Sequence, residues 1–493
     1  MLAWQFVCFW TTIHLSIPLF SSIDLPAMPL RNLLIIAITI AVALVCYRTA
    51  AKNRYANLFA EAMDVVDAKS LTVVPREQLF DAAMNGMFGK LDRYSRYISG
   101  EMFRDFDEAI SQKFGGLGIY VERHVQDNSL VILAAIPGGP ASQSGLRSGD
   151  RIVEIDGEPT LDLDRKQGVE LLRGDVGEVA KLRIQREGEF LDVDVARRVI
   201  AVESVVGDSR DDQGNWVFRL ESNPRIGYMR LRQFGERTAE EVETALEQIN
   251  GKVDSVIIDL RHNSGGLLTS AISICDMFLE PGKEIVSTQG RNRMRQSEHA
   301  SSEKLSIDQN VPVVILINRY SASASEIVAG CLQDHGRATL IGEQSWGKGT
   351  VQNIIPVRPN VSVMKLTTAS YWRPSGKPID RSTSGAEESG IWGVRPEPAF
   401  AVPMEESDVW RNFQKRNLRD IETLIPPEQQ NDLLPILLER PLLVVEPRDA
   451  GSEDPVTPVE DVEEKASSLL EWSDEVLDRA IDFLEPVAHR AAA

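Results

Sequence analysis

The sequence has few of the residues that build covalent scaffolds or metal sites. Only four of its 493 residues are cysteine, at positions 8, 46, 275 and 331. These cysteines form no CxxC pair and no cluster with histidine. A disulfide scaffold is therefore excluded, no metal site is expected, and the sequence implies no other cofactor.

Positive charge is also scarce. The chain carries 53 lysines and arginines against 73 aspartates and glutamates, a formal net charge of −20. A surface that binds nucleic acid needs an excess of Lys and Arg, so nucleic acid is excluded as a partner. Much of the acidity lies in the last hundred residues, where the Pro-rich run DAGSEDPVTPVEDVEEK predicts a linker or a disordered segment.

Long apolar runs are confined to the N-terminus. The run Leu33–Tyr47 has 15 almost uninterrupted apolar residues. That length is short for a membrane-spanning helix of about 20 residues and typical of the apolar part of a signal peptide. Basic residues follow at Arg48, Lys52 and Arg54. The positive-inside rule would place these residues in the cytoplasm, so the opposite orientation remains the alternative. We expect residues 1–50 to be a signal anchor or transmembrane segment, with the rest of the protein in the cell envelope, outside the cytoplasm.

Composition and periodicity divide the remaining chain into four parts. Apolar residues at helical spacing predict an N-terminal helical region over residues 54–112. Short strands punctuated by glycine predict a small β-rich domain over 113–199. Alternating strands and helices predict an α/β core over 200–403. Residues 404–493 are expected to form an acidic, partly disordered extension.

Functional groups in such a core collect where strands end and helices begin. Two expected strand ends are rich in glycine and small polar residues, namely RHNSGGLL (Arg261–Leu268) and NRYSASASE (Asn318–Glu326). Glycine lets backbone N–H groups point into a shared cavity, where they can stabilise an oxyanion. The two strand ends are therefore the candidate site.

Three serines crowd the second strand end, at Ser321, Ser323 and Ser325. A serine at a strand-to-helix turn can act as a nucleophile, favoured by the field of the helix N-terminus. The alternative is structural, because Ser323 with Glu326 three residues later also matches a capping box. Helix physics alone leaves both interpretations open.

A nucleophilic serine needs a base within hydrogen-bonding distance. Only six histidines are present, and His262 together with the Asp334–His335 pair could complete a Ser/His/Asp triad. A lysine can replace histidine if its amine is neutral, a state that burial favours. Lys348 is the candidate for such a base.

Lys348 lies in the run Gly342–Gln352, GEQSWGKGTVQ, which resembles a phosphate-binding loop. That motif requires Ser or Thr after the lysine and a helix beginning there. Here the next residue is Gly349, and the residues that follow predict a strand. Nucleotide binding is therefore disfavoured. We expect Trp346 to cover the amine, and a lysine exposed in a tight hairpin remains the alternative.

The run SASASEIVAGCLQDHGRATLIGEQSWGKGTVQ closely resembles the active-site region of the carboxyl-terminal processing (tail-specific) proteases. So do GMFGKLDRYSRYIS, IIDLRHNSGGLL and TTASYWRPSGKPID, and together the resemblance covers roughly residues 55–400. It implies a multidomain α/β protein with a ClpP/crotonase-like protease core, an inserted PDZ domain and an N-terminal helical segment. It also implies a serine endopeptidase that acts on protein or peptide substrates with accessible C-termini, without a cofactor.

The resemblance assigns roles by position. Ser323 is the nucleophile, Lys348 the general base and Gln352 the residue that orients the lysine amine. Asp334 is the supporting aspartate. The oxyanion donors are the amide of Ala324 and the amide of either Gly265 or Gly266. The chain departs from the family pattern at Arg93 and Ser264, where family members often have proline.

The resemblance also explains the small domain. Gly116-Leu117-Gly118-Ile119, in FGGLGI, resembles the carboxylate-binding loop of a PDZ domain, whose consecutive N–H groups bind a chain terminus. Arg173 is similar in position to an arginine between the PDZ domain and the core, which implies a coupling role. The alternative is a catalytically inactive PDZ adaptor with a protease-like body.

Overall fold

The computed structural model of the protein describes most of the chain after residue 29. The described residues are 30–51, 54–124, 127–292, 294–300, 306–382, 390, 392–438, 443–444, 457–458 and 472–491. They fall into two compact units that divide between Ala83 and Met84.

The N-terminal unit is helical, as the sequence predicted. It contains α1 (Leu30–Ala51), α2 (Arg54–Lys69) and the first part of α3 (Arg76–Phe88). Within the part of the chain that the structure describes, no helix combines the length and apolar content of a membrane span. Residues 1–29 of the expected anchor lie outside the described residues, so the anchor stays a prediction.

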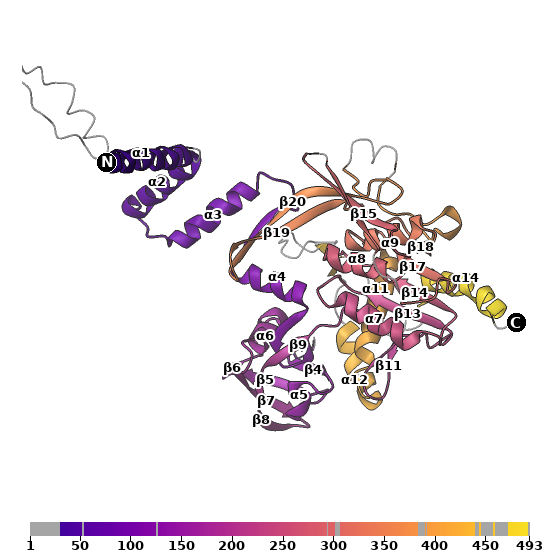
Figure 1. Cartoon of the computed structure of the whole chain (residues 1–493). Helices are drawn as coiled ribbons and strands as arrows, with labels where there is room; N and C mark the ends of the chain where they lie inside the picture. The colour runs from indigo at the N-terminus through magenta and orange to yellow at the C-terminus, as the bar shows by residue number, and fades with distance from the viewer. Residues whose placement is uncertain are drawn as a thin grey trace, which may run out of the picture. The chain divides into compact units, whose positions relative to one another are not determined.

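The second unit is built around a five-stranded, mostly parallel sheet (Figure 1). Its strands β13, β14, β17 and β18 run parallel, and β10 pairs antiparallel at one edge. In sheet order they are β10 (Val205–Val206), β13 (Ile226–Leu231), β14 (Ser255–Asp259), β17 (Val313–Ile317) and β18 (Ala338–Gly342). All residues of β13, β14 and β17 are buried, as expected for a parallel sheet covered on both faces.

Helices cover both faces of this sheet. Alternate residues of β14 show the two layers, because Val256 and Ile258 pack in one apolar cluster and Ile257 in another. The first cluster includes residues of α7 (Thr238–Ile249), α8 (Leu268–Asp276) and α9 (Ala324–Asp334). The second includes residues of α14 (Glu475–Ala491). The predicted α/β core is therefore confirmed.

A second sheet lies beside the candidate site, and one of its strands was not expected. Its strands are β1 (Arg96–Ser99), β20 (Ser362–Trp372), β15 (Glu284–Gly290), β16 (Arg295–His299) and β19 (Thr350–Arg358). Arg96–Ser99 falls in the region predicted to be helical, but it pairs antiparallel with β20. Four residues are too few to show strand periodicity, and this strand exists because of a partner far along the chain. Helix α4 (Glu101–Ser111) follows it.

The β-rich domain forms a sheet with strand β3 at one edge. In sheet order the strands are β3 (Ile119–Arg123), β4 (Leu130–Ala135), β5 (Arg151–Ile155), β7 (Val179–Arg186) and β8 (Glu189–Ala196), with β6 (Glu158–Pro159) on β5. The helices are α5 (Pro140–Gln143) and α6 (Arg165–Leu172), and β2 (Lys113–Gly116) pairs with β9 (Arg198–Ala201). A sheet edge beside a helix can accept an additional strand.

The C-terminal extension contributes helices that pack on the rest of the unit. Helices α11 (Glu406–Glu422) and α12 (Pro427–Leu438) place Leu418 and Leu433 in an apolar cluster with Val131 of β4. Of the acidic Pro-rich run that begins at residue 449, the structure describes only β22 (Thr457–Pro458), which pairs with β21 (Leu443–Val444). The expected disorder of that run therefore falls mostly outside the described residues.

Candidate active site

Two turns leave the same edge of the central sheet, where the parallel strands β14 and β17 end. We call residues 261–267, between β14 and α8, the glycine turn, and residues 318–323, between β17 and α9, the serine turn. Because β14 and β17 are adjacent and parallel, their C-terminal ends bring the two turns together. The sequence singled out both turns, and the fold makes them neighbours.

Hydrogen bonds join the two turns directly. The hydroxyl of Ser321 donates to the carbonyl of Leu260 at 2.8 Å, and the hydroxyl of Ser325 donates to the carbonyl of Asn263 at 2.9 Å. The backbone N–H of Ala322 donates to the same Asn263 carbonyl at 3.0 Å. Two of the three serines therefore have a structural role, in which they fix the serine turn to the glycine turn.

Ser323 differs from its two neighbours in conformation and in bonding. It precedes the first residue of α9 with φ 56° and ψ −113°, and its hydroxyl makes no capping hydrogen bond to that helix. A non-glycine residue in such a conformation costs about 1–3 kcal/mol and is typical of functional sites. Its side chain is buried at 7% relative exposure. Of the expected capping box, the hydrogen bond from the Ser323 N–H to the Glu326 carboxylate is formed.

The glycine turn packs against Ser323 too closely for any side chain. A Cβ on Gly265, at φ +102°, would lie 2.7 Å from the Cβ of Ser323 and 2.9 Å from the backbone nitrogen of Ala324. The Gly265 N–H donates to Asn263 Oδ1 at 2.8 Å. Within the described residues no hydrogen bond engages the N–H of Ala324 or Gly266. Of the two glycines named as oxyanion donors, Gly266 is therefore the one with an available amide.

Glu326 connects the serine turn to the loop that carries Lys348. It is fully buried. Its Oε2 accepts hydrogen bonds from the backbone N–H groups of Ser323 and Lys348, each at 2.8 Å. Its Oε1 accepts from the Ser345 hydroxyl at 2.5 Å and from the Gly347 N–H at 2.7 Å. The backbone nitrogens of Ser323 and Lys348 share one acceptor atom, so they lie no farther apart than twice 2.8 Å.

The environment of Glu326 has opposing effects on its charge. Burial raises the pKa of the Glu326 carboxyl to about 7, although hydrogen bonds from Ser345, Ser323, Gly347 and Lys348 favour the ionised form. Because four donors point at its two oxygens, the observed arrangement is that of a carboxylate. Glu326 is thus a buried acid whose charge is coupled to the geometry of both catalytic candidates.

Lys348 is buried at 8% relative exposure, and an aromatic neighbour of its amine comes from an unexpected part of the chain. The Nζ atom lies 4.7 Å from the centroid of the Tyr94 ring, which comes from the LDRYS segment before β1. Trp346 instead contacts the guanidinium of Arg381, at 4.4 Å. Tyr94 therefore covers the amine, and the cover expected from Trp346 stays a prediction. The glycine beside the lysine does permit close approach, since a Cβ on Gly349 would lie 2.2 Å from the backbone of Asp380.

Gln352 lies on β19, and its amide nitrogen is held by threonines. It donates to the Thr350 hydroxyl at 2.8 Å, to the Thr350 carbonyl at 3.1 Å and to the Thr367 hydroxyl at 3.4 Å. These bonds fix the orientation of the side chain and leave the role of its carbonyl oxygen toward the amine as a prediction. The strand–loop–strand order of β18 and β19 is as expected, so Lys348 does not begin a helix.

Asp334 lies at the opposite end of α9 from Ser323. Its carboxylate pairs with Arg373, at 2.5 Å, and accepts a hydrogen bond from the Ser375 N–H. Helix α9 has 11 residues, so its two ends are about 16 Å apart. The structure therefore does not bring Asp334 to the nucleophile, and any support from it acts through α9 and its Arg373 contact.

The alternative Ser/His/Asp triad is not assembled. The His262 ring stacks on Tyr320 at 5.2 Å and contacts Phe413 at 4.5 Å, and burial lowers the pKa of His262 to about 3. His335 contacts the carbonyl of Glu284, at the far end of α9. Across the described ranges, no hydrogen bond links either ring to Ser323.

The predicted tail-binding loop lies at the edge of the β-rich sheet. The loop connects β2 to the edge strand β3, and Gly118 within it has φ +72°. Residues just before it, Phe114 and Gly115 of β2, line a groove of about 850 Å³ together with residues of α4 and α6. Arg173, at the end of α6, donates to Glu108 of α4 at 3.1 Å and lies over the Phe114 ring. Arg173 thus connects the β-rich domain to α4.

Sequence patterns did not find two residues of this site. Glu326 was recognised only as a helix-capping residue, because the Ser345–Lys348 loop that it binds is about 20 residues away. Tyr94 contacts Lys348 across 254 positions of sequence. The capping-box pattern was a partial indication of Glu326, whereas no local pattern marks Tyr94.

Comparisons with known proteins agree with this geometry. The model of peptidase family S41 matches residues 225–391, which include Ser323 and Lys348, and a PDZ domain model matches 131–186. A carboxy-terminal-processing protease of Bartonella bacilliformis is 37% identical over 364 residues, covering 72% of this chain and 77% of that protein. The chain belongs to the carboxy-terminal-processing proteases of peptidase family S41.

Two further matches share less of their sequence with this chain. Carboxy-terminal processing protease CtpA of Bacillus subtilis is 32% identical over 330 residues, covering 66% of this chain and 65% of that protein. The solved structure of a photosystem II D1 C-terminal processing protease is 23% identical, with a TM-score of 0.38, and covers 70% of this chain and 92% of that chain. Membership of family S41 makes this protein a serine peptidase, and the match to the PDZ model shows its PDZ domain, as the sequence resemblance implied.

Proposed function

We propose that this S41 peptidase cleaves proteins whose C-terminal tails bind its PDZ domain, using Ser323 as the nucleophile and Lys348 as the general base. The observation that carries the proposal is the shared acceptor Glu326, which holds the backbones of both residues. The structural roles of Ser321 and Ser325 leave Ser323 as the hydroxyl with no such role.

The reaction takes place in two steps. The Oγ of Ser323 attacks the scissile carbonyl carbon while Lys348 Nζ accepts the hydroxyl proton. The carbonyl oxygen becomes an oxyanion beside the amides of Ala324 and Gly266. Lys348 then gives its proton to the leaving amine, the C–N bond breaks, and an acyl ester remains on Ser323. Water, deprotonated by Lys348, hydrolyses that ester and frees the enzyme.

The PDZ domain supplies the affinity for substrate tails. A chain terminus would add as a strand along the free edge of β3, with its carboxylate at Gly116–Ile119. The groove beside this loop is walled by Arg173 and Glu108, so a bound tail would lie next to the pair that connects the PDZ domain to α4. We therefore assign Arg173 the role of coupling tail binding to cleavage.

Cleavage of an unfolded test protein with an apolar C-terminus tests this function. Ser323→Ala and Lys348→Ala should each abolish cleavage, while both variants should bind a fluorescent tail peptide like the wild type. Lys377→Ala, which replaces an exposed lysine outside the site, is the control. Full cleavage by either dyad variant contradicts the proposal. Tail binding without cleavage by the wild-type protein would identify an inactive adaptor instead.

The proposed location is the cell envelope, with the N-terminal segment as a membrane anchor. What supports it is the apolar run Leu33–Tyr47, which lies within α1. We expect the full chain to sediment with membranes and to resist extraction with high salt, whereas a chain lacking residues 1–51 should be released. Equal release of both chains would contradict the anchor.

A further inference from the structure

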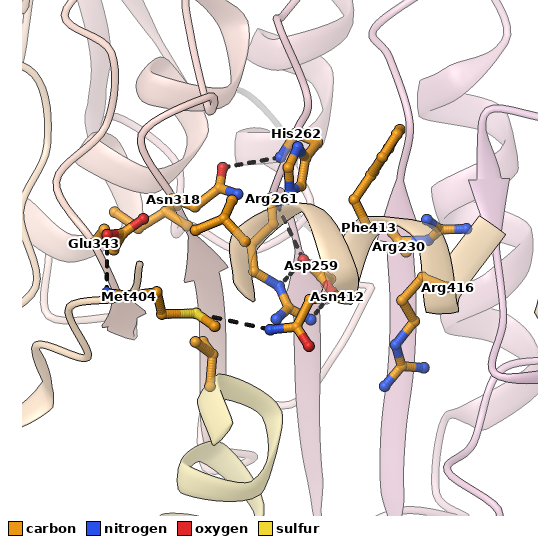
Figure 2. Close-up of a pocket in the computed structure, with 13 residues that line it drawn as sticks. Arg230, Asp259, Arg261, His262, Asn318, Glu343, Met404, Asn412, Phe413 and Arg416 are labelled. Carbon is orange, nitrogen blue, oxygen red and sulfur yellow. Dashed lines mark hydrogen bonds and ion pairs between the residues drawn. The ribbon is translucent and has the colours of Figure 1, made fainter. Parts of the chain in front are cut away.

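A small cavity lies behind the two catalytic turns, closed by the C-terminal extension (Figure 2). Its volume is about 20 Å³, enough for about one water molecule. Its lining includes Asp259, Arg261 and His262 from the glycine-turn side and Asn412, Phe413 and Arg416 from α11. The lining thus brings together the strand that leads to the glycine turn and a helix that comes much later in the sequence.

The charges around the cavity are matched, which argues against a pocket for an anion. Arg261 forms ion pairs with Asp259 and with Asp474, each at 2.7 Å. Arg230 pairs with Asp420, and Arg416 with Asp208 at 3.0 Å. A buried guanidinium needs such partners, since an unpaired buried charge costs several kcal/mol. Carboxylates of the extension therefore stabilise Arg230 and Arg261 of the core, and Asp208 of the core stabilises Arg416 of the extension.

Asp474 acts on the first residue of the glycine turn. It immediately precedes α14 and is buried at 8% relative exposure. Its two oxygens accept hydrogen bonds from both terminal nitrogens of Arg261, at 2.7 and 2.9 Å. Although burial acts in the opposite direction, Arg261 holds the pKa of Asp474 down at about 2, so Asp474 is ionised near neutral pH. The bidentate geometry fixes the plane of the guanidinium.

Glu406, in the first turn of α11, acts in the same way on the serine turn. Its carboxylate accepts hydrogen bonds from the Tyr320 hydroxyl, from Arg319 at 2.9 Å and from Trp410 at 3.1 Å. Arg319 and Tyr320 both lie in the serine turn, shortly before Ser323. The ring of Tyr320 in turn stacks on His262 of the glycine turn.

From these contacts we infer that the C-terminal extension is part of the catalytic apparatus, with Asp474 and Glu406 as positioning residues. Asp474 sets the glycine turn and its amide through Arg261, and Glu406 sets the serine turn and its hydroxyl through Arg319 and Tyr320. Neither carboxylate is assigned to a reacting atom. The inference rests on the proposed function, because it concerns the alignment of Ser323 with the oxyanion amides.

Asp474→Asn and Glu406→Gln in the full chain test the inference, with Glu475→Gln as the matched control. Glu475 is exposed, lies next to Asp474 and loses the same charge. The readouts are kcat and KM for the tailed test protein, the burst of p-nitrophenol that reports acylation of Ser323 by a p-nitrophenyl ester, and the melting temperature. A misaligned site should lower kcat and the burst rate by about tenfold or more, with KM changed less than about twofold.

The control should keep wild-type values in every readout. A purely structural role would lower the melting temperature but leave the burst rate unchanged at a temperature where the variant is folded, and that result overturns the inference. If Asp474→Asn does not fold, the same readouts on Glu406→Gln test the inference. The Glu406 carboxylate is 46% exposed, so its removal leaves less buried charge unpaired. Full cleavage by Ser323→Ala would instead reject the proposed function, whatever Asp474→Asn does.

Discussion

At the residue scale, the site depends on a backbone strain at Ser323 and a buried acid at Glu326. Ser323 has positive φ although it is not glycine, and neighbouring hydrogen bonds to Asn263 and Glu326 maintain that conformation. The conformation leaves the Ser323 hydroxyl outside the helix cap, where the proposed nucleophile can reach a substrate. The strain at Ser323 and the buried charge of Glu326 both lower the free energy of unfolding, so the effect of each can be measured.

Replacing Ser323 by glycine should separate stability from activity. Glycine adopts positive φ without steric cost, so Ser323→Gly should unfold at a free energy about 1 kcal/mol higher than Ser323→Ala. Both variants should be inactive, because both lack the hydroxyl. Urea unfolding of the two proteins gives the comparison, and a Gly variant less stable than the Ala variant would contradict the strain.

The charge of Glu326 should make stability fall as pH rises. Its pKa is about 7 in the folded protein, against an ordinary value of 4.5. The folded state therefore binds this proton more tightly than the unfolded state does. The resulting contribution to the free energy of unfolding is fully present below pH 4.5 and is lost as pH rises through about 7. The total loss is about 3 kcal/mol. Activity should rise over the same interval, because the four donors fit the ionised carboxylate.

Urea unfolding at several pH values, compared with Glu326→Gln, measures this effect. The glutamine variant cannot ionise, so the difference in unfolding free energy between the two proteins should depend on pH over that window. A pH-independent difference would show that Glu326 does not titrate there. We also expect Glu326→Gln to lose most activity, since its NH₂ group would face backbone donors instead of accepting from them.

At the scale of elements, the candidate active site includes two turns that two adjacent parallel strands bring together. Strand β14 ends at the glycine turn and β17 at the serine turn, and their register fixes the distance between the turns. Gly265 is in direct contact with the Ser323 backbone region. The contact has no room for a methyl group, which predicts strong sensitivity there.

Gly265→Ala should therefore lower activity far more than an alanine substitution at another glycine with positive φ. Its methyl group would meet the Ala322 carbonyl at 2.7 Å, and a shift of the turns by about 1 Å would reduce kcat by about a hundredfold. Gly251→Ala is the control, because Gly251 also has positive φ, +70°, but nothing within 4 Å. Similar kcat values for the two variants would contradict the close contact.

The sequence could predict these elements because their patterns are local. Fully apolar strands such as Val313–Ile317, with glycine and serine at their ends, identify a parallel core and its functional edge. Strand β1 could not be predicted, since its four residues acquire their conformation from β20. Asp474 and Tyr94 were missed for the same reason, because long-range contacts give them their positions. The packing of α14 on the core was also not predicted, because the acidic composition of the extension indicated disorder although α14 has an apolar face.

At the scale of the whole molecule, the protein combines a PDZ domain, an S41 protease core and an extension that contacts both. The PDZ domain and α4 meet at the Arg173–Glu108 pair, and α11 and α12 contact β4 of the PDZ domain. Arg173 also lines the groove that contains Phe114 and residues of α4, next to the proposed tail-binding loop. Tail binding and catalysis should therefore be coupled through this arginine.

Arg173→Ala should weaken that coupling without weakening tail affinity by much. Addition of a free tail peptide should stimulate hydrolysis of a p-nitrophenyl ester by the wild type, and the stimulation should fall by about tenfold in the variant. Lys166→Ala, on the same helix and also lining the groove, serves as the control. Equal stimulation of Arg173→Ala and wild type, with equal peptide affinity, would show that Arg173 does not couple tail binding to catalysis.

The most direct test of the central claim is to locate the acyl group on the enzyme. After mixing with a p-nitrophenyl ester and acid quenching, trypsin should release the peptide from Tyr320 to Arg337, which contains all three serines of the second strand end. Fragmentation in a mass spectrometer should place the acyl group on Ser323 in the wild type and find none in Lys348→Ala. Acylation of Ser321 or Ser325, or equal acylation in Lys348→Ala, would contradict the Ser323–Lys348 dyad.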